Sequence, residues 1–149
     1  MFLLAATFSL VISAQVPPDG YNTVQLRGYT DHQGRETNFE ISRAQATKQP
    51  RWSPDRGFPP LELSKALAVA QAAVLRHHPK APALRVDEVS LFQIGDWELQ
   101  DVWYYLFEFA PGFDCESPMD DPYETFYEVV LFDGTLVEPH IGMGRDPGK

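Results

Sequence analysis

The chain has 149 residues, 44% of them hydrophobic, which is enough for one domain with its own core and excludes a disulfide scaffold, because Cys115 is the only cysteine. Its formal net charge of −9 disfavours nucleic acid as a partner, since the phosphates would be repelled. The charge is unevenly distributed. Residues 86–144 hold 14 acidic side chains and no Lys or Arg, whereas residues 1–85 hold ten basic and six acidic ones. This split indicates association between the two halves or with a basic partner.

The first fourteen residues are apolar or small and carry no charged side chain. They predict a secretory signal peptide, Met1–Ala14, followed by a disordered leader at residues 15–22. A hydrophobic first strand is the alternative for the same segment. No other segment approaches about eighteen consecutive apolar residues, so we expect a secreted or periplasmic protein with no stable membrane insertion after cleavage.

Residues 23–145 are predicted to form a single α+β domain. Apolar and polar residues alternate in 23–27 and again in 37–41, with Gly34 between them, so residues 23–47 predict an N-terminal β-hairpin. Residues 48–60 contain four prolines, which exclude regular structure, together with Trp52 and Phe58, which favour burial. We expect this segment to be a rigid Pro-rich strap.

One helix is predicted, from Leu63 to His77, because apolar residues recur there every three or four positions. Ser64 is expected to cap its start, and Pro79 to stop it. Many residues of its inner face are alanines, and a surface that small allows a close approach to a sheet.

The rest of residues 61–141 predicts a four-stranded antiparallel meander on which the Ala-rich helix packs. Asp133 and Gly134 form the strongest local signal, a tight hairpin that needs a positive φ. Acidic residues such as Glu88, Glu108 and Glu128 are expected on the solvent-facing side of this sheet. The predicted strands are Val86–Ile94, Val102–Phe109, Thr125–Phe132 and Thr135–Ile141.

The aromatic run from Trp103 to Phe109 places alternate residues on opposite faces of the sheet. The helix covers only one of these faces. We expect the other, with Tyr104 and Leu106, to lie under the Pro-rich strap, because Trp52 and Phe58 need a place to be buried.

This order of one helix and four strands, opened by Leu61–Ala70 and closed by Tyr127–Val137, resembles the PepSY-like group of exported domains over roughly residues 61–141. The resemblance implies a small sheet curled around one helix. It also implies a secreted or periplasmic module that regulates or inhibits a partner protein, often in connection with peptidases, and that has no catalytic residues to transfer.

Acidic and aromatic side chains gather in the long segment between the second and third predicted strands. Such a segment suits a protein or peptide partner with a basic surface, since carboxylates steer cations and aromatic rings anchor them. Weak Ca²⁺ binding and a solvated loop without function are the alternatives, and the spacing is not that of an EF-hand. The candidate binding residues are Phe113, Asp114, Glu116, Asp120, Asp121 and Tyr123.

No nucleophile motif, phosphate-binding glycine loop or zinc-ligand spacing is present, so we predict no catalytic residue, no metal site and no cofactor. The four histidines, His32, His77, His78 and His140, are interpreted as structural. The main hypothesis is a non-catalytic exported binding module. The first alternative is an enzyme or hydrolase with a pocket lined by two convergent titratable groups, and the second is an envelope-associated protein that binds divalent cations.

Overall fold

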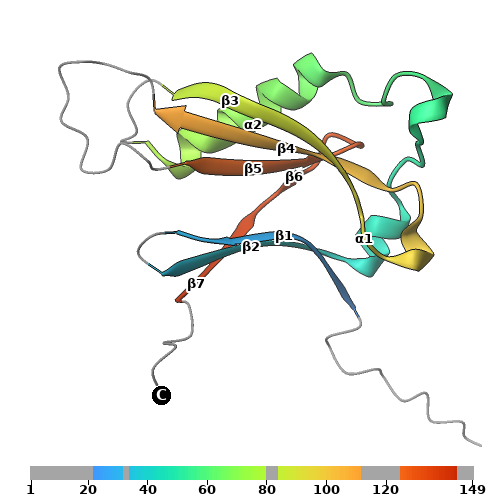
Figure 1. The fold of residues 1–149 in the computed structure, drawn as a ribbon, viewed down its shortest axis with the longest axis horizontal. Coiled ribbons are helices and arrows are strands. Elements are labelled where there is room, and N and C mark those ends of the chain that lie inside the picture. The colour runs from blue at the N-terminus through green and yellow to red at the C-terminus, as the bar shows by residue number, and fades with distance from the viewer. Residues whose placement is uncertain (1–21, 32–33, 80–83, 112–124, 144–149) are drawn as a thin grey trace, which may run out of the picture.

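The computed structural model describes residues 22–31, 34–79, 84–111 and 125–143, which form two antiparallel sheets and one main helix (Figure 1). This is the α+β architecture with a β-meander that the sequence predicts. Within these ranges, none of the helices has both the length and the apolar character needed to cross a membrane.

The larger sheet has the strand order β3 (Leu84–Gln93), β4 (Trp103–Pro111), β5 (Phe126–Leu131) and β6 (Leu136–Val137). The helix α2 (Leu63–His77) packs on one face of it, mainly over β5. Small buried side chains, Ala66, Ala70 and Ala73, allow this close approach. The helix is preceded by Glu62 with no side-chain cap, so the expected capping role of Ser64 is wrong, because that residue already lies in the first turn.

The smaller sheet has the order β1 (Thr23–Thr30), β2 (Arg35–Ser42) and β7 (Pro139–Met143). The N-terminal hairpin is therefore present as predicted. The fourth predicted strand, Thr135–Ile141, is instead divided between the two sheets: β6 pairs with β5, and β7 pairs with β2. Pro139 would face Tyr127 if the β5–β6 ladder continued, but it has no N–H to donate, and the chain crosses to the smaller sheet there.

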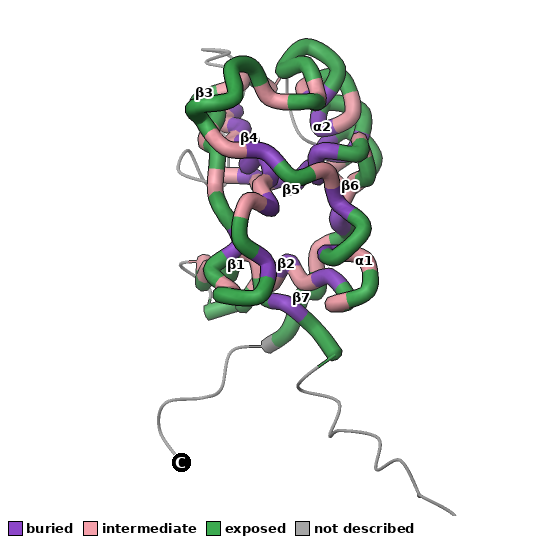
Figure 2. Tube along the Cα trace, turned by 90° about the vertical axis from the view of Figure 1, so that its right-hand side faces the viewer, coloured by how far each residue is buried: buried purple, intermediate pink, exposed green. Residues whose placement is uncertain are grey.

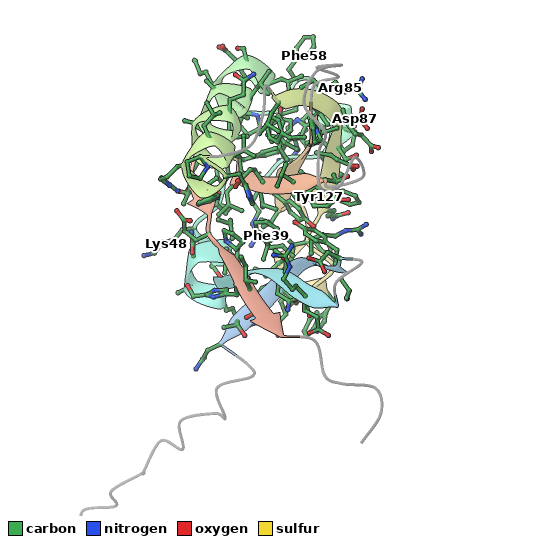
Figure 3. The ribbon with its side chains drawn as sticks, turned by 90° about the vertical axis from the view of Figure 1, so that its left-hand side faces the viewer. Phe39, Lys48, Phe58, Arg85, Asp87 and Tyr127 are labelled. Atoms are coloured by element: carbon green, nitrogen blue, oxygen red, sulfur yellow. The ribbon has the colours of Figure 1, made fainter. Side chains whose placement is uncertain are left out.

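The two sheets pack face to face around Phe39, which is fully buried (Figure 3). Tyr104 and Leu106 belong to the same cluster, so the N-terminal hairpin, and not the Pro-rich strap, covers this face of the larger sheet. The tube coloured by burial shows buried segments in both sheets and in α2 (Figure 2).

The strap lies on the helix side instead. Trp52 packs edge to face on Trp103 and Phe132, with ring centroids 5.4 and 5.8 Å apart, and its Nε1 donates to the carbonyl oxygen of Gly57 at 3.1 Å. Phe58, by contrast, is 97% exposed, so its expected burial is wrong. A short 3₁₀ helix, η2 (Pro54–Arg56), follows Trp52.

Two further short helices lie at one end of the molecule. The helix α1 (Arg43–Thr47), which the sequence pattern does not predict, is capped by Ser42, whose Oγ accepts from the amide of Gln45. Next to it is the 3₁₀ helix η3 (Trp97–Leu99). Arg43 joins the two through ion pairs to Asp96 at 2.5 Å and Glu98 at 2.8 Å. The basic first half of the chain thus meets part of the acidic second half.

The predicted hairpin between β5 and β6 is confirmed. Gly134 has a φ of +86°, a conformation that glycine adopts without strain, and its amide donates to the carbonyl oxygen of Leu131 at 2.9 Å.

Candidate functional site

An inter-sheet cavity of about 730 Å³ opens where the two sheets separate, beside the C-terminal end of α2. The inward-facing residues of β2 explain it. Ile41 and Phe39 fill the space between the sheets, but the next two on the same face are Thr37 and Arg35, which leave it unfilled. The lining residues are Tyr29, Thr30, Asp31, Arg35, Thr37, His77, His78, Thr125, Phe126, Tyr127, Glu128, Pro139 and Ile141.

One wall of the cavity is a row across the smaller sheet. Tyr29, Thr37 and Ile141 are direct neighbours on β1, β2 and β7. On the opposite wall, the ring of Tyr127 contacts that of Tyr29, with centroids 4.0 Å apart and the ring planes tilted by 37°. Beside it, Phe126 and His78 form a second ring pair at 4.1 Å. The cavity thus combines flat apolar faces with hydroxyl groups.

A buried carboxylate borders this cavity. Glu128 lies opposite Phe107 in the β4–β5 ladder, so its side chain points toward α2, and it is 0% exposed. The expectation that it faces solvent is therefore wrong, because α2 covers that side of β5. Burial raises the pKa of Glu128 above its ordinary 4.5, and the hydrogen bond and charge of His77 oppose this shift.

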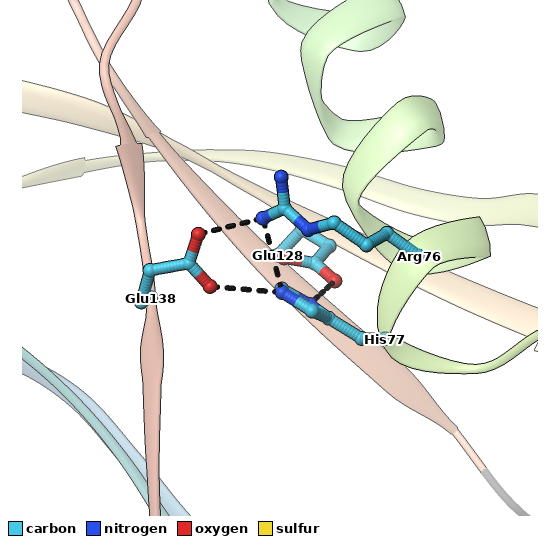
Figure 4. Close-up of polar contacts among 4 residues, drawn as sticks. All are labelled: Arg76, His77, Glu128 and Glu138. Carbon is cyan, nitrogen blue, oxygen red and sulfur yellow. Dashed lines mark hydrogen bonds and ion pairs between the residues drawn. The ribbon is translucent and has the colours of Figure 1, made fainter.

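Four side chains, Arg76, His77, Glu128 and Glu138, form a polar cluster that we call the clip (Figure 4). His77 Nδ1 lies 2.8 Å from Glu128 Oε1, and His77 Nε2 lies 2.8 Å from Glu138 Oε2. Arg76 Nη2 donates to Glu138 Oε1 at 2.6 Å. The clip therefore ties the last turn of α2 to β5 and to the crossover between β6 and β7. Cations at this position also interact favourably with the helix dipole.

Two polar atoms beside the cavity are buried without a hydrogen-bond partner: Tyr29 Oη and Glu128 Oε2. The pKa of Tyr29 is raised, first by burial and then by Tyr127 and Glu128. Trp103 Nε1, on the helix side, is the third such atom among the described residues. Because buried polar groups are nearly always hydrogen-bonded, each exception requires an explanation. Two of the three exceptions belong to residues that line the cavity.

The predicted signal peptide, His32 and Cys115 lie outside the described residues. So do all the candidate binding residues predicted from the sequence: Phe113, Asp114, Glu116, Asp120, Asp121 and Tyr123. His140 is exposed on β7. Within the part of the chain that the structure describes, no group of three or more His, Cys, Asp or Glu side chains is placed to hold a metal ion.

The sequence pattern places His77 only at the end of a helix, and it predicts that Glu128 lies on the solvent-facing side of the sheet. One signal was available: Glu128 is the single charged residue in the strand Phe126–Leu131. A carboxylate within such an apolar strand indicates a partner from another element.

Comparison with protein-family models, with curated proteins and with solved structures finds no match to this chain. The resemblance to PepSY-like domains stays a prediction, and any functional proposal depends on the geometry of the cavity and the clip.

Proposed function

We propose that this protein is a small exported binding domain whose ligand occupies the inter-sheet cavity. The observation that carries the proposal is the unfilled space of about 730 Å³ whose lining includes Tyr29 and Glu128, the two residues that carry the unpartnered buried atoms Oη and Oε2. Ligand pockets are typically about 300–1,000 Å³ and largely apolar, with a few convergent polar groups. The cavity has a volume in this range, and its lining combines aromatic and aliphatic side chains with a few polar groups.

The charges around the cavity favour a neutral ligand. Asp31 pairs with Arg35 at 2.6 Å, and Glu128 pairs with His77, so each carboxylate of the lining already has a cationic or hydrogen-bonding partner. A hydroxyl group both donates and accepts, which suits a carboxylate oxygen and a phenol that each lack a partner. The ligand class is thus a neutral hydroxylated molecule with one flat apolar face.

Binding is favoured over acid–base catalysis by the position of His77. It borders the cavity together with Glu128, as the enzyme hypothesis requires of two titratable groups. Both of its ring nitrogens, however, lie 2.8 Å from carboxylate oxygens. Neither nitrogen is free to exchange a proton with a substrate. The predicted contact of residues 114–121 with a basic partner protein stays a separate prediction.

Phenol is a suitable probe, because it carries one hydroxyl on a flat ring. We expect its addition to shift the backbone amide resonances of Tyr29, Thr37 and Tyr127 in NMR spectra of the ¹⁵N-labelled protein. Toluene lacks the hydroxyl, and benzoate and benzylammonium add a charge, so all three should bind more weakly.

Two variants locate the binding. Thr37→Phe places a ring inside the cavity and should abolish the shifts, whereas Thr135→Phe adds the same ring at an exposed position of the β5–β6 turn and should not. Equal shifts in both variants would contradict the proposed site. Stronger binding of benzylammonium than of phenol would contradict the neutral ligand class.

A further inference from the structure

His77 donates a hydrogen bond to both carboxylates of the clip only when its ring is protonated. Each ring nitrogen of His77 faces a carboxylate oxygen, Glu128 Oε1 on one side and Glu138 Oε2 on the other. A neutral imidazole has one N–H and one lone pair, so it can donate to only one of the two carboxylates. The imidazolium ion donates to both. Arg76 Nη2 is also near His77 Nε2, but at 3.2 Å, farther than the carboxylate.

The charges of the clip balance in the same state. Arg76 and a protonated His77 carry two positive charges, and Glu128 and Glu138 carry two negative ones. Loss of the His77 proton leaves Glu128 as a fully buried anion without its nearest cation, which is an expensive arrangement. Arg76 also lowers the pKa of Glu128, but by less than His77 does, and Glu138 raises it.

Other charged groups near the clip do not replace this proton. His78, the next residue of α2, has its pKa lowered by burial, then by His77 and by Arg35, so it favours the neutral form. Arg35 on β2 is itself paired with Asp31. Opening of the clip is therefore the way in which Glu128 regains solvent or another partner.

Glu128 lines the cavity, but in the closed clip its side chain offers no accessible surface to a ligand. Its Oε2 has no hydrogen-bond partner, and the side chain has no exposed surface. A ligand hydroxyl therefore requires movement of the surrounding groups to reach this oxygen, and His77 is the side chain bonded to the same carboxylate. Clip opening and ligand binding at Glu128 therefore favour each other.

We propose that the clip is a proton-controlled gate of the inter-sheet cavity. The protonated His77 holds the end of α2 against β5 and withholds Glu128 from the ligand. Loss of this proton releases the turn and exposes the carboxylate, so affinity for a hydroxylated ligand rises with pH. The ligand part of this inference rests on the proposed function, whereas the opening of the clip does not.

The opening is measured without any ligand. NMR follows the protonation of the His77 ring over about pH 5 to 8, and amide hydrogen exchange is recorded at the same pH values. After correction for the intrinsic pH dependence of exchange, we expect the protection of residues 74–78 to fall about tenfold as His77 loses its proton. Unchanged protection across that titration would overturn the gate.

Matched variants separate the clip from general effects of pH. Glu138→Gln substitutes an amide that can accept from or donate to His77 Nε2, at a side chain that is 63% exposed, so folding is retained. The pH effect should be reduced, because only the contact of His77 with Glu128 then depends on the proton. His140→Gln removes an exposed histidine away from the cavity and should behave like the wild type. Persistence of the full effect in Glu138→Gln would also overturn the gate.

Phenol then tests the coupling. Its affinity for the wild type should be about fivefold or more higher at the upper end of this range than at the lower end, and should change less with pH in Glu138→Gln. Equal affinity at both ends would overturn the gate but leave the cavity as a binding site. Absence of phenol binding at every pH would overturn the proposed function, while the exchange measurement would still decide whether the clip opens.

Discussion

Replacing Thr37 with phenylalanine should leave the protein as stable as the wild type or more stable. Thr37 lies on the central strand of the smaller sheet, between Tyr29 and Ile141, and its side chain points into the cavity. Phenylalanine is a good strand former, so the backbone is not opposed to the change. The new ring enters space that no side chain occupies.

The magnitude follows from the burial. Fully burying a Phe side chain contributes about 1.5–3 kcal/mol. The wild-type position is only half-buried, so we expect part of that gain, roughly 1 kcal/mol, which corresponds to a rise in Tm of about 2–4 °C. If the space were already well packed, the same substitution would cost about 1–3 kcal/mol. The sign of the change therefore distinguishes the two cases.

Urea unfolding followed by tryptophan fluorescence provides the measurement. Val129→Phe is the matched control, because Val129 is fully buried in the packed part of the same inter-sheet layer and should lose about 1–3 kcal/mol. A loss of more than about 1 kcal/mol in Thr37→Phe, close to that of the control, would refute the unfilled cavity.

Five other substitutions test the packing, the β5–β6 turn and the buried carboxylate. Phe39→Ala removes the fully buried ring between the sheets and should cost about 3–5 kcal/mol in urea unfolding; a cost under about 1 kcal/mol would contradict the face-to-face packing. Trp52→Ala should lower the free energy of unfolding by a similar amount, whereas that of Phe58→Ala should lie within about 0.5 kcal/mol of the wild type. Equal effects of the two substitutions would contradict the placement of the strap. Gly134→Ala should cost about 1 kcal/mol because of its positive φ, measured as a lower Tm, and an unchanged Tm would contradict that turn. Burial raises the folded-state pKa of Glu128 above 4.5, so the contribution of this group to stability is present below about pH 4.5 and is lost as pH rises. Glu128→Gln should therefore flatten the decline of Tm with pH above that value. An unaltered decline would argue against the raised pKa of Glu128.

The elements that local sequence patterns determine could be predicted. The helix of α2 follows from apolar residues at three- and four-residue spacing, and the β5–β6 hairpin follows from Asp133 and Gly134. The meander follows from strands that succeed one another along the chain with no second long helix between them. In each of these elements the signal lies within a few neighbouring residues.

Features that depend on distant residues could not be predicted. The choice of sheet for Pro139–Met143 depends on pairing with β2, about a hundred residues earlier in the chain. The exposure of Phe58 depends on how the strap lies on the helix side after Trp52 is buried. The burial of Glu128 depends on His77, because an isolated strand pattern assigns a carboxylate to solvent.

Intermolecular NOEs between phenol and the ¹³C-labelled protein test the cavity as a ligand site most directly. We expect cross-peaks from the phenol ring protons to the methyl groups of Thr37 and Ile141, two neighbours on the cavity wall. Cross-peaks only to exposed apolar side chains elsewhere, such as Phe58, Leu63 or Trp97, would show that phenol binds the outer surface and would contradict the proposed function.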